Sequence, residues 1–440
     1  MKLFPRLLTA GVISTFLLAL SAFAAKPGEW PQWRGPGRDG VWNEPGIVEK
    51  FATPELKPRW RVPISNGYSG PTVVGGKVYV TDRVTTPKQQ ERIHCFDWQT
   101  GRPLWTHAYD APYGGIGYPD GPRASVTIDE GRAYSLGAVG QLVCLDAAKG
   151  TVVWSKSLDA EYDLRLPVWG IAAAPLVYQD QVIVHIGGDK GACVVSFDKK
   201  SGQERWRALD DRPSYSPPIL VEQGGKKVVV CWTGDRVVGL DPGTGKLHWE
   251  YPFPAKQVVI AIATPIVQND LLFFTNFYEG SLMLRLKPDM GVEKVWQRRG
   301  QNERNTDGLH SIISTPMFQG DYVYGVDSYG ELRCLDSKTG ERVWESQAAV
   351  PRARWANIHF VKQADRVWMF NERGQLIISH LSPKGYEEIS RAQLIQPTTG
   401  QLPERGGVCW AHPAFAYGHV FARNDNELVC ASLKAGSTSR

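Results

Sequence analysis

Short apolar runs alternate with polar, glycine-containing turns along almost the whole chain. GPTVVGGKVYVTD (70–82) and TPMFQGDYVYGVDSYGELRCLD (315–336) each begin with an apolar run, a glycine turn and an aromatic-rich run. Short runs bounded by glycine turns predict strands joined in hairpins. The three-to-four-residue spacing of an amphipathic helix is nowhere sustained. The pattern therefore predicts an all-β protein.

One of these turns belongs to a motif that recurs along the chain. In its clearest copy, CLDSKTGERVW (334–344), a strand is followed by aspartate, a TG turn and, four residues after the glycine, tryptophan. These three residues recur at Asp97, Gly101, Trp105; Asp146, Gly150, Trp154; Asp198, Gly202, Trp206; Asp241, Gly245, Trp249; and Asp336, Gly340, Trp344. A looser copy ends at Trp296, and a copy without tryptophan ends at Ser390. Starting from an isolated Trp60, these end points are 43 to 52 residues apart, the period of a four-stranded propeller blade.

Each part of the motif has a structural role. The aspartate accepts backbone N–H groups of the turn, and the glycine supplies the positive φ that a tight hairpin needs. The tryptophan offers a large flat surface to the neighbouring sheet. Because one sheet cannot bury both of its faces alone, a closed ring of sheets is needed to make a core.

We expect the ring to have eight blades. They cover about residues 70–106, 123–155, 172–207, 215–250, 263–297, 312–345, 355–390, and 411–434 together with 57–64. Trp60 has the same spacing from the next repeat as the motif tryptophans have from one another, but no motif precedes it. The last repeat supplies only three strands. The strand at Trp60 should therefore complete the last blade. The expected fold is an eight-bladed β-propeller of four-stranded antiparallel blades, closed by this N-terminal strand.

The beginning of the chain indicates export. Residues 1–24 combine a basic end at Lys2 and Arg6, an apolar run from Leu7 to Leu20 and a small-x-small cleavage site ending at Ala24. This pattern is typical of a secretory signal peptide, and the apolar run is short for a membrane anchor. We expect a periplasmic or secreted protein with no transmembrane segment in the mature chain.

Between the signal peptide and the propeller lies a segment rich in Trp, Pro and Gly, residues 25–56. Three tryptophans in a short span argue against disorder. We expect an ordered arm that Trp30, Trp33 and Trp42 pack onto the ring, in which Arg34, Arg38 and Asp39 make local polar contacts. The propeller is expected over 57–434, followed by a short tail, 435–440.

Charge and cysteine content narrow the class of partner. Cleavage after Ala24 lowers the net charge from +5 to about +3 without leaving a basic block, which excludes nucleic acid as an implied partner. Four cysteines (Cys95, Cys144, Cys334, Cys430) occupy equivalent strand positions in different repeats. Facing sheets lie too far apart for these to pair, so we interpret them as buried thiols. For Cys193, Cys231 and Cys409 the sequence does not decide between a free thiol and a disulfide. We expect the protein to be a monomer.

Candidate functional residues lie in the long connections between blades. These connections share the ring face opposite the TG turns and contain Arg123, Trp169, Arg354, Trp355 and Trp410, as well as Tyr68, Tyr215 and His412. An aromatic and arginine-lined mouth over a central channel suits a planar anionic ligand or a peptide. Aromatic residues of long loops also pack against one another with no ligand. Asp307 and His310 form either an acid/base pair or the cap of a turn, and other catalytic motifs are missing from the sequence.

The motif LDxxTGxxxW, as in Leu335 to Trp344, resembles the repeat of the pyrroloquinoline-quinone-like (PQQ-like) propellers over about residues 57–434. WPQWRGPGRDG, YPDGPRAS and DGLHSIISTP are similar to an exported bacterial branch of mostly unassigned function. The family holds quinoprotein alcohol dehydrogenases and non-enzymatic outer-membrane assembly proteins. The resemblance to the enzymes implies PQQ and Ca²⁺ as cofactors. However, this chain has no adjacent cysteines, and no calcium-ligand motif is matched.

Two functions in different classes follow. The first is a non-catalytic binding or assembly scaffold that takes a protein, peptide or saccharide on its loop face, with other exported or envelope proteins as partners or a small ligand in the channel. The second is a PQQ- and calcium-dependent alcohol or sugar dehydrogenase with an atypical site. The enzyme requires carboxylates and an amide converging on one calcium position, whereas the scaffold does not.

Overall fold

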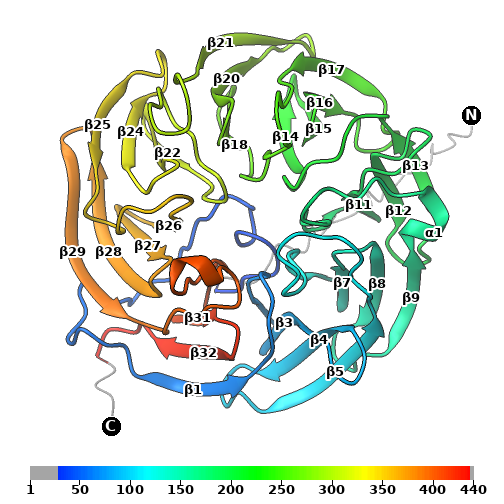
Figure 1. Ribbon diagram of the computed structural model, residues 1–440, viewed down its shortest axis with the longest axis horizontal. Helices are drawn as coiled ribbons and strands as arrows, with labels where there is room; N and C mark the ends of the chain where they lie inside the picture. Colours follow the sequence, from blue (N-terminus) through cyan, green and yellow to red (C-terminus); the bar gives the residue numbers. More distant parts are fainter. Residues whose placement is uncertain (1–27, 437–440) are drawn as a thin grey trace, which may run out of the picture.

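The computed structural model describes residues 28–436, and the predicted signal peptide and residues 437–440 lie outside this span. Eight four-stranded antiparallel sheets form a closed ring around a central channel (Figure 1). This confirms the predicted eight-bladed propeller. Within the described residues, no helix is both long enough and apolar enough to cross a membrane.

Seven blades are built from consecutive strands that run in chain order from the centre of the ring outward (Figure 1). Blades 1 to 4 comprise β2 (Thr72–Val74), β3 (Lys77–Val84), β4 (Gln90–Asp97) and β5 (Pro103–Asp110); β6 (Thr127–Asp129), β7 (Arg132–Leu136), β8 (Gln141–Asp146) and β9 (Val152–Ser157); β10 (Leu176–Tyr178), β11 (Gln181–His185), β12 (Val194–Asp198) and β13 (Glu204–Ala208); and β14 (Ile219–Gln223), β15 (Lys226–Trp232), β16 (Arg236–Leu240) and β17 (Leu247–Pro252).

Blades 5 to 7 comprise β18 (Ile266–Gln268), β19 (Leu271–Asn276), β20 (Gly280–Leu286) and β21 (Val292–Arg298); β22 (Met317–Gln319), β23 (Tyr322–Val326), β24 (Leu332–Asp336) and β25 (Arg342–Ser346); and β26 (Ile358–Gln363), β27 (Arg366–Asn371), β28 (Gln375–Ser382) and β29 (Gly385–Gln393). Two short helices, α1 (Leu158–Tyr162) and the 3₁₀ helix η1 (Pro403–Arg405), lie in connections between blades.

The eighth blade combines both ends of the chain. Its inner strands are β30 (Ala414–Ala416), β31 (His419–Arg423) and β32 (Glu427–Ser432), and β1 (Pro58–Pro63) is its outermost strand. Trp60 pairs with Cys430 in the antiparallel register of β1 and β32. The predicted closure of the ring by the strand at Trp60 is therefore confirmed.

The structure explains why the motif joins its aspartate to a glycine and a tryptophan. Asp97 Oδ1 accepts hydrogen bonds from the backbone N–H groups of Gln99 (3.1 Å) and Thr100 (2.9 Å) and so holds the TG turn. The Trp105 ring lies over Gly150 of the next blade, where φ is +72° and an added methyl group would lie 2.5 Å from the ring. The motif is thus a contact between blades as well as a turn.

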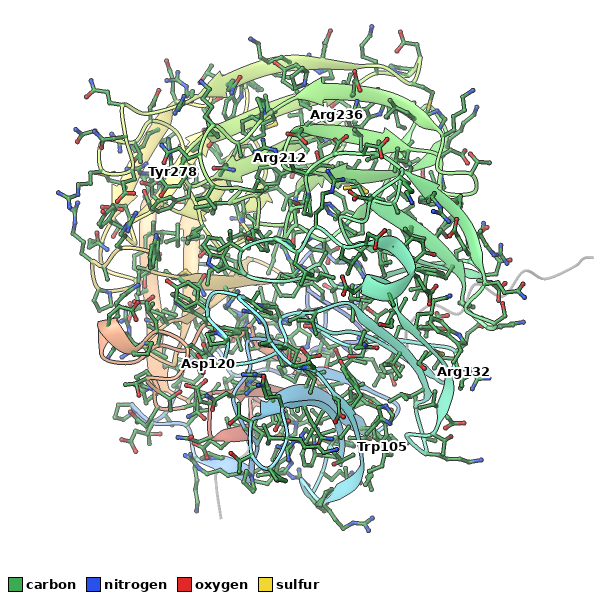
Figure 2. All side chains as sticks on the ribbon, turned by 45° about the vertical axis from the view of Figure 1, so that its right-hand side comes forward. Trp105, Asp120, Arg132, Arg212, Arg236 and Tyr278 are labelled. Carbon is green, nitrogen blue, oxygen red and sulfur yellow. The ribbon has the colours of Figure 1, made fainter. Side chains whose placement is uncertain are left out.

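The same contact recurs around the ring. Tryptophan rings also lie over the motif glycine of the following blade at Trp60 and Gly101, Trp154 and Gly202, Trp206 and Gly245, and Trp296 and Gly340. Each of these indole N–H groups donates to a backbone carbonyl of that turn, as Trp60 does to Trp98 at 2.8 Å. Trp249, which faces the looser motif copy, instead donates to the Gln223 side chain at 2.8 Å. Side chains fill the space between the ribbons of neighbouring blades (Figure 2).

The N-terminal arm, of which residues 28–56 are described, crosses the middle of the ring (Figure 1). Trp30 and Trp42 are buried in the largest hydrophobic cluster, together with Trp368 and Phe415 of blades 7 and 8. The backbone N–H of Trp30 donates to the carbonyl of Val73 at 2.7 Å. The predicted packing of these two tryptophans onto the ring is confirmed.

The two buried arginines of the arm behave differently. Arg34 makes the expected local contact, donating to the carbonyl of Asp39 at 2.8 Å. Arg38 reaches across the channel and donates to the carbonyls of Ala174 (3.3 Å), Pro175 and Pro218 (3.2 Å). Arg38 also makes the expected local contact, because its Nε donates to Gln32 Oε1 at 2.8 Å. The additional contacts arise because the arm lies inside the ring, where the guanidinium meets backbone carbonyls next to the innermost strands.

All seven cysteines are buried free thiols, including Cys193, Cys231 and Cys409, which the sequence left open. Burial raises the pKa of Cys95 and of Cys231 to about 12. Since the thiolate is the reactive form, these cysteines act as small apolar side chains.

Candidate functional site

A pocket of about 280 Å³ lies in the central channel, where the connections between blades meet. Residues from all eight connections line it, because each connection leads into the innermost strand of the next blade. The opposite end is closed by Trp33 of the arm, whose indole N–H donates to Thr264 Oγ1 at 2.7 Å. The pocket is therefore blind and opens on the loop face.

The five binding residues proposed from sequence all line this pocket: Arg123, Trp169, Arg354, Trp355 and Trp410. They come from four different connections between blades, so only the closed propeller brings them together. Tyr68, Tyr215 and His412 line the pocket as well. Whether these residues bind a ligand stays a prediction.

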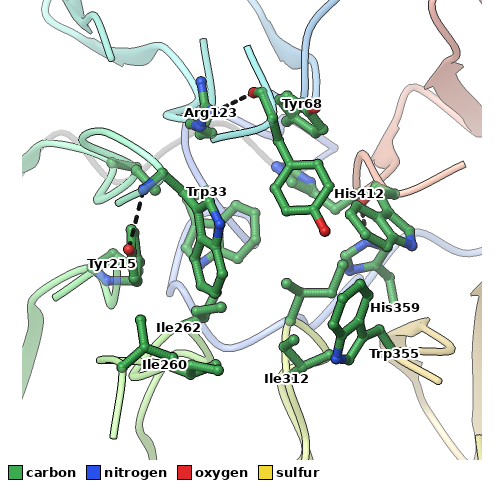
Figure 3. Close-up of a pocket in the computed structure, with 18 of the residues that line it drawn as sticks. Trp33, Tyr68, Arg123, Tyr215, Ile260, Ile262, Ile312, Trp355, His359 and His412 are labelled. Carbon is green, nitrogen blue, oxygen red and sulfur yellow. Dashed lines mark hydrogen bonds between the residues drawn. The ribbon is translucent and has the colours of Figure 1, made fainter. Parts of the chain in front are cut away.

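The wall of the pocket has an aromatic part and an aliphatic part. Trp169 packs on Tyr215 with ring centroids 5.1 Å apart, and Tyr118 lies between Trp169 (6.3 Å) and Trp410 (6.2 Å). The aliphatic part consists of Ile260, Ile262, Ile312 and Ile313 with neighbouring small residues. Figure 3 shows Ile260, Ile262 and Ile312 on the side opposite Tyr68 and Arg123. A flat apolar group can contact both parts at once.

Two guanidinium groups bring positive charge to the wall. Arg123 stacks 5.0 Å over the Tyr68 ring and donates to the backbone carbonyls of Gly117 (3.0 Å) and Tyr118 (2.5 Å). No carboxylate forms an ion pair with Arg123 among the described residues, and its guanidinium donates to backbone carbonyls instead. Arg354 stacks 4.6 Å over Trp355 and pairs with Glu303 at 2.6 Å, while its Nε atom is buried without a partner.

Acidic and amide side chains are missing from the described lining, which contains no Asp, Glu, Asn or Gln. Asp120 accepts from Tyr68 Oη at 3.2 Å but does not itself line the pocket. Across residues 28–436, no group of three or more His, Cys, Asp or Glu side chains is placed to hold a metal ion. The carboxylates and the amide that a calcium–quinone site requires are thus missing from the described lining of this pocket.

The two histidines of the pocket are neutral. Burial lowers the pKa of His359 to about 4 and that of His412 to about 3. His412 Nε2 lies 2.9 Å from Ser125 Oγ and Nδ1 lies 3.2 Å from the Pro413 carbonyl, so both ring nitrogens are engaged. His359 Nε2 lies 2.8 Å from the Trp410 carbonyl. These hydrogen bonds hold the rings in place and leave no charged imidazole.

Two aromatic residues of the wall have an unusual backbone. Tyr118 (φ 50°) and Trp355 (φ 66°) adopt the left-handed conformation, which costs energy for a bulky residue. The neighbouring packing must offset this cost. The left-handed backbone fixes the directions in which these two rings enter the pocket.

Asp307 and His310 lie outside the central pocket. The Asp307 carboxylate pairs with Arg298 at 3.1 Å and lines a separate polar cleft between blades 5 and 6. His310 is buried, with Nδ1 3.0 Å from the Phe277 carbonyl and Nε2 accepting from the Gly300 N–H at 3.1 Å. Burial lowers the pKa of His310. The two side chains share no hydrogen bond among the described residues, and each has a structural partner of its own.

The fold and the site define a PQQ-like propeller with a blind central pocket. Residues 89–346 match the family model described as outer membrane protein assembly factor BamB. The chain therefore belongs to this family of PQQ-like repeat β-propellers.

Curated relatives fall into two classes. The chain is 29% identical over 170 residues to a quinohemoprotein alcohol dehydrogenase of Comamonas testosteroni, which covers 37% of the chain and 22% of the enzyme. It is 23% identical over 218 residues to outer membrane protein assembly factor BamB of Burkholderia pseudomallei, which covers 48% of the chain and 52% of that protein. The chain thus spans about a fifth to a half of these relatives' length.

Solved structures of the same two classes share the fold. BamB of Moraxella catarrhalis superposes with a TM-score of 0.59 at 16% identity, covering 86% of this chain and 99% of that one. The quinohemoprotein alcohol dehydrogenase of Comamonas testosteroni superposes with a TM-score of 0.67 at 15% identity, covering 95% and 82%. At such low identity the likeness concerns the fold alone.

Proposed function

We propose that the protein is a non-catalytic binding protein of the cell envelope that takes a compact, apolar and negatively charged group into its central pocket. The observation that carries this proposal is the composition of the pocket wall. It combines aromatic and aliphatic side chains with two guanidinium groups and, among the described lining residues, no carboxylate. Such a wall favours an aromatic ring with an anionic substituent, presented by a partner protein, a peptide or a small molecule.

The polar groups of the pocket support binding rather than catalysis. A general acid or base works best with a pKa near the working pH, but burial lowers the pKa of His359 and of His412 far below that range. A saccharide is less suitable than a peptide or aromatic anion, because its hydroxyl groups need many polar partners. An envelope partner fits the relatives named as outer membrane assembly factors.

The pocket meets only part of the requirements of the alternative function, a PQQ-dependent dehydrogenase. PQQ is a planar anion, and the aromatic wall with Arg123 and Arg354 suits its ring and its charge. Calcium requires several oxygen ligands, and the described lining residues supply no carboxylate or side-chain amide. The residues present therefore do not fit a calcium-bound quinone, and we derive no redox step for this site.

Titration calorimetry with a matched pair of probes tests the proposal. The probes are 2-naphthoate and the neutral 2-naphthalenemethanol, which share a ring and differ in charge. We expect the carboxylate to bind more tightly, and Arg354→Gln to weaken its binding by about 10-fold, the value of one charge-assisted hydrogen bond. Arg352→Gln is the control, since this exposed arginine of the same loop does not line the pocket.

The same titration distinguishes the dehydrogenase alternative. Calcium-dependent binding of PQQ, together with dye reduction by alcohols or sugars, would contradict a non-catalytic role. Equal binding of both naphthalene probes would refute the role of charge, and binding of neither would refute the pocket as the site for an aromatic group.

A further inference from the structure

A second, smaller cavity lies between the arm and the innermost strands, on the other side of Trp33 from the central pocket. It encloses about 20 Å³, room for a single atom or water molecule. Trp30 and Arg34 of the arm line it together with Thr315, His359 and His412. Because Trp33 and both histidines line the two spaces, the small cavity supports the floor of the large one.

Arg34 brings a buried positive charge to this cavity, and the nearby Asp39 offsets the cost of its burial only in part. Its side chain is 7% exposed, and burial lowers its pKa to about 10 while the nearby Asp39 opposes this shift, so it is charged at neutral pH. Nη2 donates to the Asp39 carbonyl at 2.8 Å, but Nη1 is buried and has no partner in the described chain. No carboxylate forms an ion pair with Arg34 among residues 28–436. A buried charge with no direct ion pair is unfavourable.

Two other side chains at the cavity have an unused donor. Trp30 is 1% exposed, and its indole N–H is buried without an acceptor. Thr315 Oγ1 accepts from the Thr264 N–H at 3.1 Å, which leaves the hydroxyl hydrogen to donate. Both ring nitrogens of His412 are already engaged. The set of a guanidinium, an indole N–H and a hydroxyl calls for a ligand that only accepts hydrogen bonds.

We propose that this cavity is a binding site for a monatomic anion of the size of chloride. An anion neutralises Arg34 and accepts from Trp30 and Thr315, whereas a water molecule offers no charge and brings two hydrogens that need acceptors. A tetrahedral oxyanion such as sulfate is too large for the space. The bound anion links Trp30 and Arg34 of the arm to Thr315 of the ring. It therefore stabilises the position of the arm at the closed end of the channel.

Thermal unfolding in different salts tests the proposal. The midpoint of unfolding is measured in sodium chloride, bromide and gluconate at equal ionic strength. We expect a saturable rise of a few degrees with either halide and not with gluconate, because a ligand that binds only the folded state stabilises it. Arg34→Met should abolish the difference between the salts.

Arg38→Met is the matched control. Arg38 is a buried arginine of the same arm, but it donates to three backbone carbonyls and does not line the cavity. This variant should lower the midpoint in every salt while keeping the rise with halide. Equal midpoints in halide and gluconate for the wild-type protein would overturn the proposal.

A crystallographic measurement covers the case in which Arg34→Met does not fold. Wild-type crystals grown in sodium bromide should show an anomalous bromide peak in contact with Arg34 Nη1 and Trp30 Nε1. Density for water with no anomalous signal at this position would refute the anion site. The central pocket is not needed for either outcome, so this test is independent of the proposed function.

Discussion

Removal of the Trp60 side chain tests the closure of the ring. Trp60 is 8% exposed, lies 6.0 Å from Phe421 and packs over Gly101 of blade 1. Its indole N–H donates to the Trp98 carbonyl at 2.8 Å. We expect Trp60→Ala to lower the free energy of unfolding by about 3 to 5 kcal/mol, of which the lost hydrogen bond supplies about 1 kcal/mol.

The assay combines guanidinium unfolding with hydrogen exchange, and Trp105→Ala is the matched variant. Trp105 makes the same contact with Gly150, but its blade is one continuous segment of chain. Both variants should lose stability. Only Trp60→Ala should also speed exchange selectively in β1 and β32, because β1 is held to its blade by this pairing and by its packing.

Two results would refute this reasoning. One is an unfolding free energy for Trp60→Ala within about 0.5 kcal/mol of wild type, the range of ordinary surface substitutions. The other is unchanged exchange in β1 despite a loss of stability, which would show that the strand does not depend on Trp60 for its attachment.

Three further substitutions test other features of the fold. Gly150→Ala should destabilise by more than Gly131→Ala in urea unfolding: both glycines have positive φ, but only Gly150 has Trp105 over it; equal losses would show that the backbone alone requires glycine. Burial alone would raise the pKa of Asp82, but hydrogen bonds from a neighbouring histidine and arginine outweigh it and hold the pKa well below its usual range. The Asp82 carboxylate therefore stabilises the fold above about pH 4, and this stabilisation is lost as the pH falls. In Asp82→Asn, the midpoint temperature of unfolding should depend less on pH below about pH 4. Burial lowers the pKa of His359 to about 4, so the unfolded chain takes up a proton first and stability falls as the pH decreases from about 6.5; His359→Gln should reduce this slope, and an unchanged slope would contradict the neutral state.

The fold could be predicted from the sequence because its determinants are local and repeated. Asp97, Gly101 and Trp105 lie within nine residues and act in one turn and one contact, so the same pattern recurs in five of the blades. The count of blades then followed from the period. The closure at Trp60 could be predicted because one strand was missing from the last repeat.

The candidate site could be predicted only in part. Arg123, Trp169 and Trp410 could be selected because they are large or charged side chains in connections that share one face of the ring, and these residues do line the pocket. Ile260 and Ile312 also line it but resemble ordinary strand residues, and nothing local marks them. Trp33 was expected to pack on the ring, but its place at the end of the channel depends on the path of the whole arm.

Asp307 and His310 show a limit of reasoning from spacing. The two residues are close in sequence, but the loop turns the Asp307 carboxylate toward Arg298 and buries the His310 ring against the Phe277 carbonyl. Which direction a loop side chain takes depends on partners that the sequence does not bring near.

The construction of the last blade from both ends of the chain matters for biosynthesis. β1 pairs with β32, and Trp30 and Trp42 of the arm pack against Trp368 and Phe415. During translation these early apolar residues have no native partner until nearly the whole chain has been made. The unfinished chain therefore exposes apolar surface until synthesis is nearly complete, and such surface is prone to aggregation. A premature stop before β32 leaves an open ring with an unpaired edge that is prone to aggregation.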